Sequence, residues 1–383
     1  MLVVVVVVVF MLGCADPPSA ARPTATATGT TPNDLVLSSC EGERVALVTA
    51  SGDARLDVLS LDEAPARAVF LDDGSQPWMV DVVGPSRAVV SLFGSNEVAL
   101  VSPCDQVVLS RVSAATVVDV SPPVTLRVAE DVDGDGIDDV IVSRMVARSP
   151  QAVVVVGAEV FVTYSNLLAL SVGGEPMLSG PGLLARFRLS PSAAQADELS
   201  FVDAVRLPCE NPGGMVGNGE HLVVGCSGRF LFDGGGTQRA SAGGIVVVDV
   251  GTFAVTASIT LADFSAGTPA LHGDTIVVGN LLGGELRRYD LSLALLDSVV
   301  LGDANESIFS VVNVLQSGSD ADVGAALFLA GTFVVSPFGA ATTLQVAAEG
   351  PARGLIDVAI DDDDGSALGL LTLSAELVRV ELP

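Results

Sequence analysis

The stretch that decides the fold is residues 77–110, which read PWMVDVVGPSRAVVSLFGSNEVALVSPCDQVVLS. It contains four short runs rich in Val and Leu, namely MVDVV, AVVSLF, EVALVS and VVLS. The segments Gly-Pro-Ser, Gly-Ser-Asn and Pro-Cys-Asp-Gln separate these runs. Short β-branched runs that alternate with turn residues are the signal of antiparallel hairpins. We therefore predict a unit of four antiparallel strands in this stretch.

The second and third runs of this unit recur, in looser form, along the rest of the chain. The copies begin at Arg44, Arg87, Glu159, His221, Thr275, Ala325 and Ala367. Seven copies at a spacing of about 50 residues match four-stranded blades repeated around an axis, each of which buries two apolar faces against its neighbours. We therefore predict an all-β protein, a β-propeller of seven four-stranded blades. Six or eight blades stay open, because residues 117–160 exceed the share of one blade.

Closure of such a ring needs a strand from one end of the chain beside the blade formed by the other end. A ring left open would expose unpaired strand edges. We expect Leu35, Val36 and Leu37 to supply the closing strand next to the last blade.

The composition is that of a folded and strongly acidic protein. Of the 383 residues, 49% are hydrophobic and 17% are charged. The mean hydropathy of +0.58 reflects strand cores, because the apolar runs after residue 13 are short and a spanning helix needs roughly 20 apolar residues. The 46 acidic residues outnumber the 18 basic ones, all Arg, and give a net charge of −28. A chain so negative repels nucleic acid and anionic lipid headgroups, and it attracts cations.

The N-terminal residues indicate export. An apolar run from Leu2 to Leu12 has the length of a signal-peptide core and is too short to span a membrane as a helix. Residues 14–33 are rich in Pro, Thr and Ala, which is typical of a flexible tether. We predict a signal peptide at residues 1–13, a tether at 14–33 and the propeller domain at 34–383.

The sequence Met11-Leu12-Gly13-Cys14 resembles the lipobox of bacterial lipoproteins. The resemblance implies a lipid on Cys14, and therefore a membrane partner and a place in the cell envelope. Met11 stands where the lipobox usually has Leu, and no Lys or Arg precedes the apolar run. Ala15, rather than Asp, follows the cysteine, which implies the outer membrane if the source is Gram-negative. An ordinary signal peptide with an unmodified cysteine is the alternative.

Four cysteines remain in the body of the chain, Cys40, Cys104, Cys209 and Cys226. An even number in an exported chain indicates two disulfides, and four cysteines allow three pairings. We favour Cys209 with Cys226, because a predicted strand-turn-strand segment joins them. Cys40 with Cys104 then follows by elimination. Four separate buried thiols are the alternative.

Two segments resemble YVTN/NHL-like propellers, EVFVTYSN at residues 159–166 and SLFGSNEVALVSP at residues 91–103. In that family a strand leads through a Gly-Ser-Asn turn into the next strand. The resemblance therefore supports the propeller prediction, and it implies no particular activity.

Residues 130–142, EDVDGDGIDDVIV, form the one motif with a definite chemistry. Asp occupies loop positions 1, 3, 5 and 9 and Gly occupies position 6, so that alternate carboxylates can surround a hard cation. Val142 at position 12 excludes an EF-hand, which needs Glu there. The motif is similar to the calcium loop of FG-GAP repeats. That resemblance implies a structural Ca²⁺ with side-chain ligands Asp131, Asp133, Asp135 and Asp139 and the backbone of Ile137. A solvated acidic turn is the alternative.

Recognised catalytic motifs are absent from the sequence, including GxSxG, the phosphate-binding loop and HExxH. We interpret the two histidines, His221 and His272, as ordinary residues at or just before strands.

We predict a lipid-anchored binding or scaffold module, rather than an enzyme, with an unidentified protein or small-molecule partner. The alternatives are a propeller hydrolase or lactonase with a metal in the channel, and an FG-GAP-like adhesion module. Polar residues of several blades around a cation would favour the enzyme. An uncharged or plugged channel with an apolar outer patch would favour the scaffold.

Overall fold

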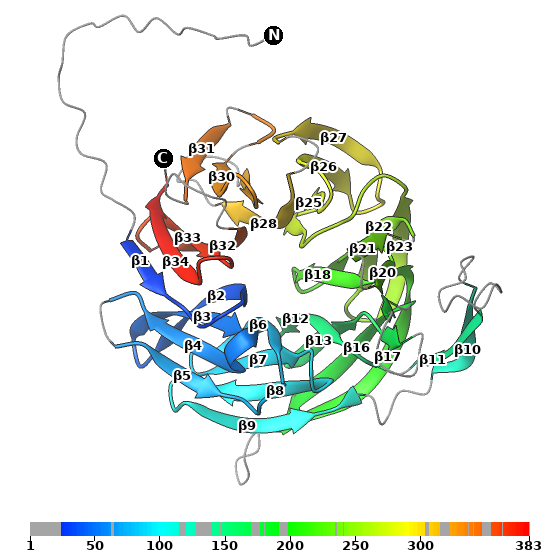
Figure 1. The fold of residues 1–383 in the computed structure, drawn as a ribbon, viewed down its shortest axis with the longest axis horizontal. Helices are drawn as coiled ribbons and strands as arrows, with labels where there is room; N and C mark the ends of the chain where they lie inside the picture. The colour runs from blue at the N-terminus through cyan, green and yellow to red at the C-terminus, as the bar shows by residue number, and fades with distance from the viewer. Residues whose placement is uncertain are drawn as a thin grey trace, which may run out of the picture.

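The computed structural model describes residues 24–62, 65–114, 120–127, 140–145, 147–169, 177–179, 181–190, 198–233, 236–239, 241–302, 306–314, 322–335, 337–339, 341–346, 354–361 and 363–382. Their regular secondary structure is β-strand, apart from the 3-10 helix η1 (Ser51–Asp53). No helix in these ranges has the length and apolar content to cross a membrane. Seven four-stranded antiparallel sheets form the ring in Figure 1, which confirms the predicted seven-bladed β-propeller.

The first three blades follow one another along the chain. Blade 1 contains β2 (Pro32–Cys40), β3 (Glu43–Ala50), β4 (Arg55–Ser60) and β5 (Arg67–Phe70). Blade 2 contains the four predicted strands of the opening stretch, β6 (Pro77–Gly84), β7 (Arg87–Leu92), β8 (Glu97–Ser102) and β9 (Val107–Val112). Blade 3 contains β12 (Pro150–Val156), β13 (Glu159–Tyr164), β16 (Pro181–Ser190) and β17 (Glu198–Glu210).

The remaining four blades complete the ring. Blade 4 contains β18 (Pro212–Gly217), β19 (His221–Cys226), β22 (Gly243–Asp249) and β23 (Ala254–Leu261). Blade 5 contains β24 (Ala270–His272), β25 (Thr275–Gly279), β26 (Glu285–Asp290) and β27 (Leu295–Val300). Blade 6 contains β28 (Ile308–Val314), β29 (Asp322–Leu327), β30 (Thr332–Val335) and β31 (Thr342–Gln345). Blade 7 contains β32 (Leu355–Asp361), β33 (Ser366–Leu371), β34 (Glu376–Glu381) and the closing strand.

The closing strand is β1 (Thr24–Ala27), which pairs antiparallel with β34 (Figure 1). The prediction that residues 35–37 close the ring is wrong, because they belong to β2, the innermost strand of blade 1. Leu35 packs in the core between blades 7 and 1, as expected for an apolar residue of an inner strand. Thr24–Ala27 lies within the stretch predicted as a tether. Because it pairs in the sheet of blade 7, these four residues belong to the propeller instead.

Two additions extend the seven blades. β10 (Val120–Arg127) and β11 (Val140–Met145) pair as a separate hairpin between blades 2 and 3, and they account for the extra length of residues 117–160. An accessory sheet joins β14 (Leu167–Ala169) and β15 (Met177–Ser179) of blade 3 to β20 (Phe230–Asp233) and β21 (Gly236–Arg239) of blade 4. Both of its halves lie in the connection between the second and third strands of their blade.

The described residues form seven hydrophobic clusters, one in each interface between neighbouring blades. Successive side chains of a strand point to opposite faces, so one strand can contribute to two clusters. In β3, Val45 and Leu47 pack against blade 2, whereas Ala46 and Val48 pack against blade 7. This is why the strands read as nearly continuous apolar runs and why no blade buries its faces alone.

Candidate ligand-binding site

The site begins with an irregularity at the start of the inner strands. In six of the blades the pairing between the first and second strand shifts register directly after its first residue pair, for example between Pro32 and Asp34. Such a bulge re-aims a side chain that would otherwise pack between sheets. Here it turns the residues at this level toward the central axis, where they line a cavity of about 490 Å³.

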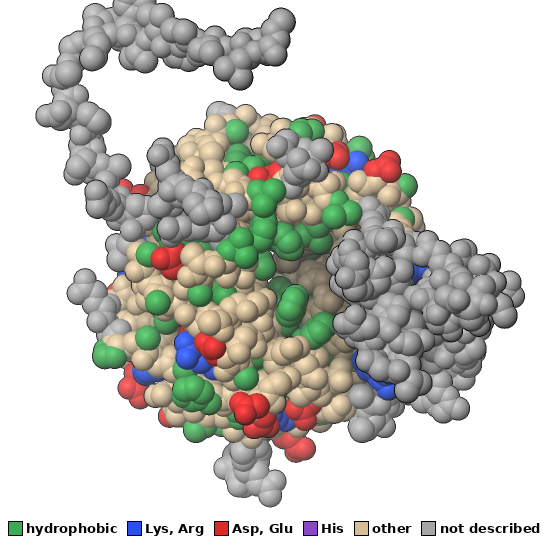
Figure 2. All heavy atoms as spheres, viewed as in Figure 1, with side chains coloured by type: hydrophobic (Ala, Val, Ile, Leu, Met, Phe, Trp, Pro, Cys, Tyr) green, Lys and Arg blue, Asp and Glu red, His purple; other side chains and the backbone are tan. Residues whose placement is uncertain are grey.

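Each blade contributes one residue to this ring. In blade order the ring residues are Asn33, Trp78, Gln151, Gly213, Gly267, Phe309 and Ile356. Two of them, Gly213 and Gly267, are glycines in neighbouring blades. Figure 2 shows hydrophobic side chains gathered around the central hollow.

Aromatic side chains form the apolar wall. The rings of Trp78 and Phe93 lie 5.3 Å apart and are tilted by 32°. On the other side of the axis the ring of Phe309 lies 5.0 Å from that of Phe328, which is not itself a lining residue. Aromatic pairs at such distances present rigid apolar surface to a ligand, since few torsion angles have to be fixed.

Blades 3 and 4 form a polar wall. The Gln151 side chain donates from Nε2 to Oδ1 of Asn211 at 3.0 Å, and Asn211 donates from Nδ2 to Oγ of Ser227 at 2.6 Å. The Ser227 carbonyl accepts a hydrogen bond from Ser265 at 2.7 Å. The chain of bonds holds these amides in fixed orientations at the cavity wall.

Two carboxyl groups of the cavity lining belong to Asp34 of blade 1 and Asp357 of blade 7. Each residue directly follows the ring residue of its strand. Asp34 is 7% exposed and accepts a hydrogen bond from the Val80 amide at 2.7 Å. Asp357 accepts from the amides of Leu35 at 3.0 Å and Val358 at 2.9 Å. The side chains of Asp34 and Asp357 hydrogen-bond to each other, which requires one of them to hold a proton.

Burial and the neighbouring carboxylate raise the pKa of Asp34 well above its usual value. Burial also raises the pKa of Asp357, although hydrogen bonds from Ser310 and two backbone amides act in the opposite direction. Because Asp357 receives more donors, the shared proton belongs on Asp34. The pair therefore keeps one proton to a higher pH than two separate carboxyl groups would.

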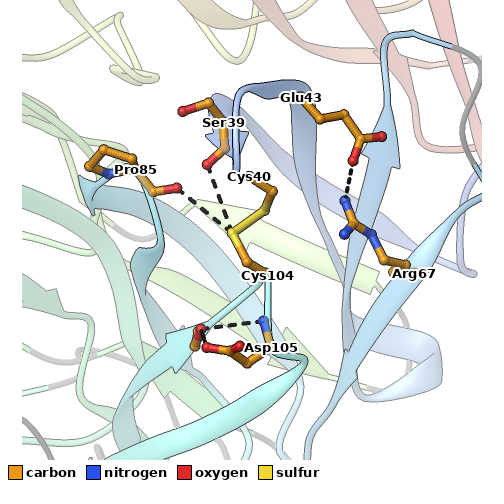
Figure 3. The surroundings of a disulfide bond; sticks show 8 residues. Ser39, Cys40, Glu43, Arg67, Pro85, Cys104 and Asp105 are labelled. Carbon is orange, nitrogen blue, oxygen red and sulfur yellow. Dashed lines mark hydrogen bonds and ion pairs between the residues drawn. A yellow bond between two sulfur atoms is a disulfide. The ribbon is translucent and has the colours of Figure 1, made fainter.

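The predicted site residues lie elsewhere. The four body cysteines pair as Cys40–Cys104, with Cα atoms 5.3 Å apart, and Cys209–Cys226, with Cα atoms 6.1 Å apart; these are the favoured pairings. Each disulfide joins consecutive blades, since Cys40 ends β2 and Cys104 lies in the turn after β8 (Figure 3). The Glu43–Arg67 ion pair, at 2.8 Å, lies nearby.

The lipidation residue and the calcium ligands lie outside the described residues. These residues are Cys14, Asp131, Asp133, Asp135, Ile137 and Asp139. The strand predicted to follow the acidic loop is present as β11, which begins at Val140. Within the described ranges no group of three or more His, Cys, Asp or Glu side chains is placed to hold a metal ion. His221 and His272 begin β19 and end β24, and neither lines the cavity.

Sequence reasoning missed the cavity, although one signal was present. Four of the inner strands begin with proline, Pro32, Pro77, Pro150 and Pro212, and a ring residue directly follows each of them. Proline is tolerated at the first residue of a strand, where no ladder bond is needed. The recurring proline therefore marks the level at which the inner strands enter the channel.

Solved structures share the fold at low sequence identity. A chain of the mitotic checkpoint complex matches with a TM-score of 0.62 and 10% identity over 98% of both chains. A streptogramin B lyase matches with a TM-score of 0.60 and 10% identity, over 94% of this chain and 98% of that one. Virginiamycin B lyase from Staphylococcus aureus matches with a TM-score of 0.59 and 8% identity, over 94% and 99%. No family model and no curated protein matches the sequence.

These likenesses concern the fold alone. The similarity to virginiamycin B lyase supports the β-propeller architecture. Because the matching structures range from a lyase to a checkpoint assembly, the fold by itself assigns no activity to this chain.

Proposed function

We propose that this protein is an exported, lipid-anchored propeller that binds a small molecule with an apolar, ring-bearing body in its central cavity. The observation that carries the proposal is the ring of seven residues, one from each blade, around about 490 Å³ of space. Ligand pockets of proteins typically enclose about 300–1,000 Å³, and they combine apolar walls with a few fixed polar groups.

The composition of the channel favours ligand binding over a purely structural role. Trp78, Phe93, Phe309 and Ile356 offer apolar surface, and the bonded amides of blades 3 and 4 offer fixed donors and acceptors. A scaffold whose channel only closes the ring needs neither space nor buried charge there. This channel has both, since two carboxyl groups line it.

The fluorescence of Trp78 tests the proposal directly, because it is the only Trp of the chain and it lines the cavity. We expect phenylbutanol, a neutral ring-bearing probe, to change the emission in a saturable way. Gly213→Leu should weaken this binding roughly tenfold or more, since the added side chain fills space in the cavity. Gly251→Leu, in an exposed turn after β22, is the matched control and should leave it unchanged. Emission that does not respond to the probe in the unaltered protein would refute the proposal.

Lipid attachment at Cys14 is the second part of the proposal. The lipobox-like residues and the Pro/Thr/Ala-rich stretch support it, because a tether between anchor and propeller leaves the cavity accessible. The closing strand starts at Thr24, ten residues after Cys14. Cells given a fatty-acid probe should label the wild-type protein and not Cys14→Ser. Equal labelling of both proteins, or of neither, would contradict the anchor.

Structural calcium binding between β10 and β11 is the third part. Asp131, Asp133, Asp135 and Asp139 with the carbonyl of Ile137 are the proposed ligands, and the alternating spacing of the carboxylates supports them. Bound calcium should stabilise the native protein by about 2.7 kcal/mol at a hundredfold excess over Kd. Tm should rise with calcium and fall with chelator, and Asp135→Ala should abolish this response. If neither calcium nor chelator changes Tm, the calcium site is refuted and the segment is a solvated acidic turn.

A further inference from the structure

We propose that the ligand of the central cavity is an organic cation, an ammonium group on an apolar body, whose charged end lies against Asp34 and Asp357. This inference rests on the proposed binding function and specifies the chemical class of the ligand.

The placement of the two carboxyl groups supports a cation. Around the ring they lie between Phe309 of blade 6 and Trp78 of blade 2, so an aromatic residue of the lining stands on each side of the pair. They also lie one residue deeper along the inner strands than the aromatic ring residues. An apolar body at the level of the aromatic rings would therefore direct its charged end toward the carboxyl pair. Aromatic faces attract ammonium groups through the ring quadrupole, and more strongly away from water.

The charges around the cavity also favour a cationic ligand. Neither Arg nor His is among the lining residues of the described chain, so no basic side chain neutralises the carboxyl pair. The chain as a whole carries a net charge of −28, which attracts cations to the cavity mouth over long range. An anionic ligand would be repelled by this arrangement, and a neutral ligand would gain no attraction between charges.

Binding of the cation has a defined proton balance. In the free protein Asp34 donates its proton to Asp357, and Asp357 and Asp81 are the carboxyl groups that act on Asp34 from neighbouring strands. An ammonium N–H takes the place of that donor, and the proton of Asp34 passes to the solvent. Two carboxylates then face one cation, so about one proton is released for each ligand bound. Affinity should therefore increase as pH rises.

Matched probes test this on the unaltered protein. Phenylbutylammonium, phenylbutanol and phenylbutyrate differ mainly in the charge of their polar end, and Trp78 emission reports the binding of each. We expect the cation to bind roughly tenfold or more tightly than the alcohol, and the anion to bind most weakly. The Kd of the cation should fall roughly tenfold for each pH unit while Asp34 holds its proton, and that of the alcohol should stay constant.

Two variants separate the contributions. Asp34→Asn keeps a donor toward Asp357 but has no proton to release, so it should abolish the pH dependence. Asp34→Asn combined with Asp357→Asn should remove the preference for the cation, and a cooperative thermal transition reports whether that double variant is folded. If the double variant does not fold, the pH dependence of the cation Kd in the wild type and in Asp34→Asn tests the inference.

The outcomes distinguish the two proposals. Binding of the alcohol with equal or weaker binding of the cation would overturn the cation inference and leave the binding function intact. A cation Kd that does not change with pH would also overturn it. Failure of all three probes to bind would refute the binding function itself.

Discussion

Replacement of Asp34 by Asn should remove part of the pH dependence of stability without loss of a hydrogen bond. In the native protein Asp34 accepts from the Val80 amide and donates its proton to Asp357. An asparagine amide reproduces both bonds, with its oxygen toward Val80 and its NH₂ group toward Asp357. The variant therefore differs from the wild type mainly in having no proton to lose.

The expected magnitude follows from this one proton. The unfolded chain releases it at a pH of about 3.9, whereas the folded protein retains it to higher pH because the pKa of Asp34 is raised. Stability contributed by this group therefore falls as pH rises above about 4, by up to about 1.4 kcal/mol per pH unit, until the folded pair loses its proton. With about 2.1 cal/mol/K of unfolding entropy per residue over roughly 360 residues, this slope corresponds to about 2 °C in Tm per pH unit.

Scanning calorimetry at constant ionic strength, from about pH 4.5 to about pH 8.5, measures this effect. We expect wild type and Asp34→Asn to melt together at the acid end, and the variant to melt increasingly higher as pH rises. The difference between the two proteins cancels the background from the large net charge. Asp81→Asn is the informative control, because Asp81 accepts from two amides, those of Val155 and Val82. The control should cost about 1–3 kcal/mol, because an NH₂ group replaces one of its two accepting oxygens. Parallel Tm curves for wild type and Asp34→Asn would refute the assignment of the proton.

Two further predictions concern the disulfides and the closing strand. Cys40→Ala with Cys104→Ala should lower the free energy of unfolding in urea by about 4 kcal/mol, and Cys209→Ala with Cys226→Ala by about 3 kcal/mol, because the first pair closes the longer loop. An equal loss, or a larger loss from the second pair, would contradict the loop-length argument. Deletion of residues 1–27 removes β1 and leaves β34 as an open edge, so it should lower the urea midpoint and promote aggregation, whereas deletion of residues 1–23 should change neither. Identical behaviour of the two truncated proteins would mean that β1 does not hold the ring closed.

Local sequence determined the architecture of this protein. Short β-branched runs such as Arg87–Leu92 form strands because their side chains pack on pleated surfaces, and the turns between them need only a few suitable residues. The formation of a strand or a turn depends on residues close together in the sequence. The strands of the blades and their repetition could therefore be predicted from the sequence. The two disulfide pairs followed from cysteine number and from one strand-turn-strand segment.

Only the tertiary structure decided the closing strand, the accessory sheet and the cavity. Thr24–Ala27 has no apolar pattern of its own and forms a strand because β34 offers it an unpaired edge. The accessory sheet needs insertions from two blades, neither of which predicts its partner. Every blade contributes to the lining of the cavity, and the carboxyl pair joins residues 34 and 357. Contacts between positions so far apart in the chain arise from closure of the ring, and no local pattern records them.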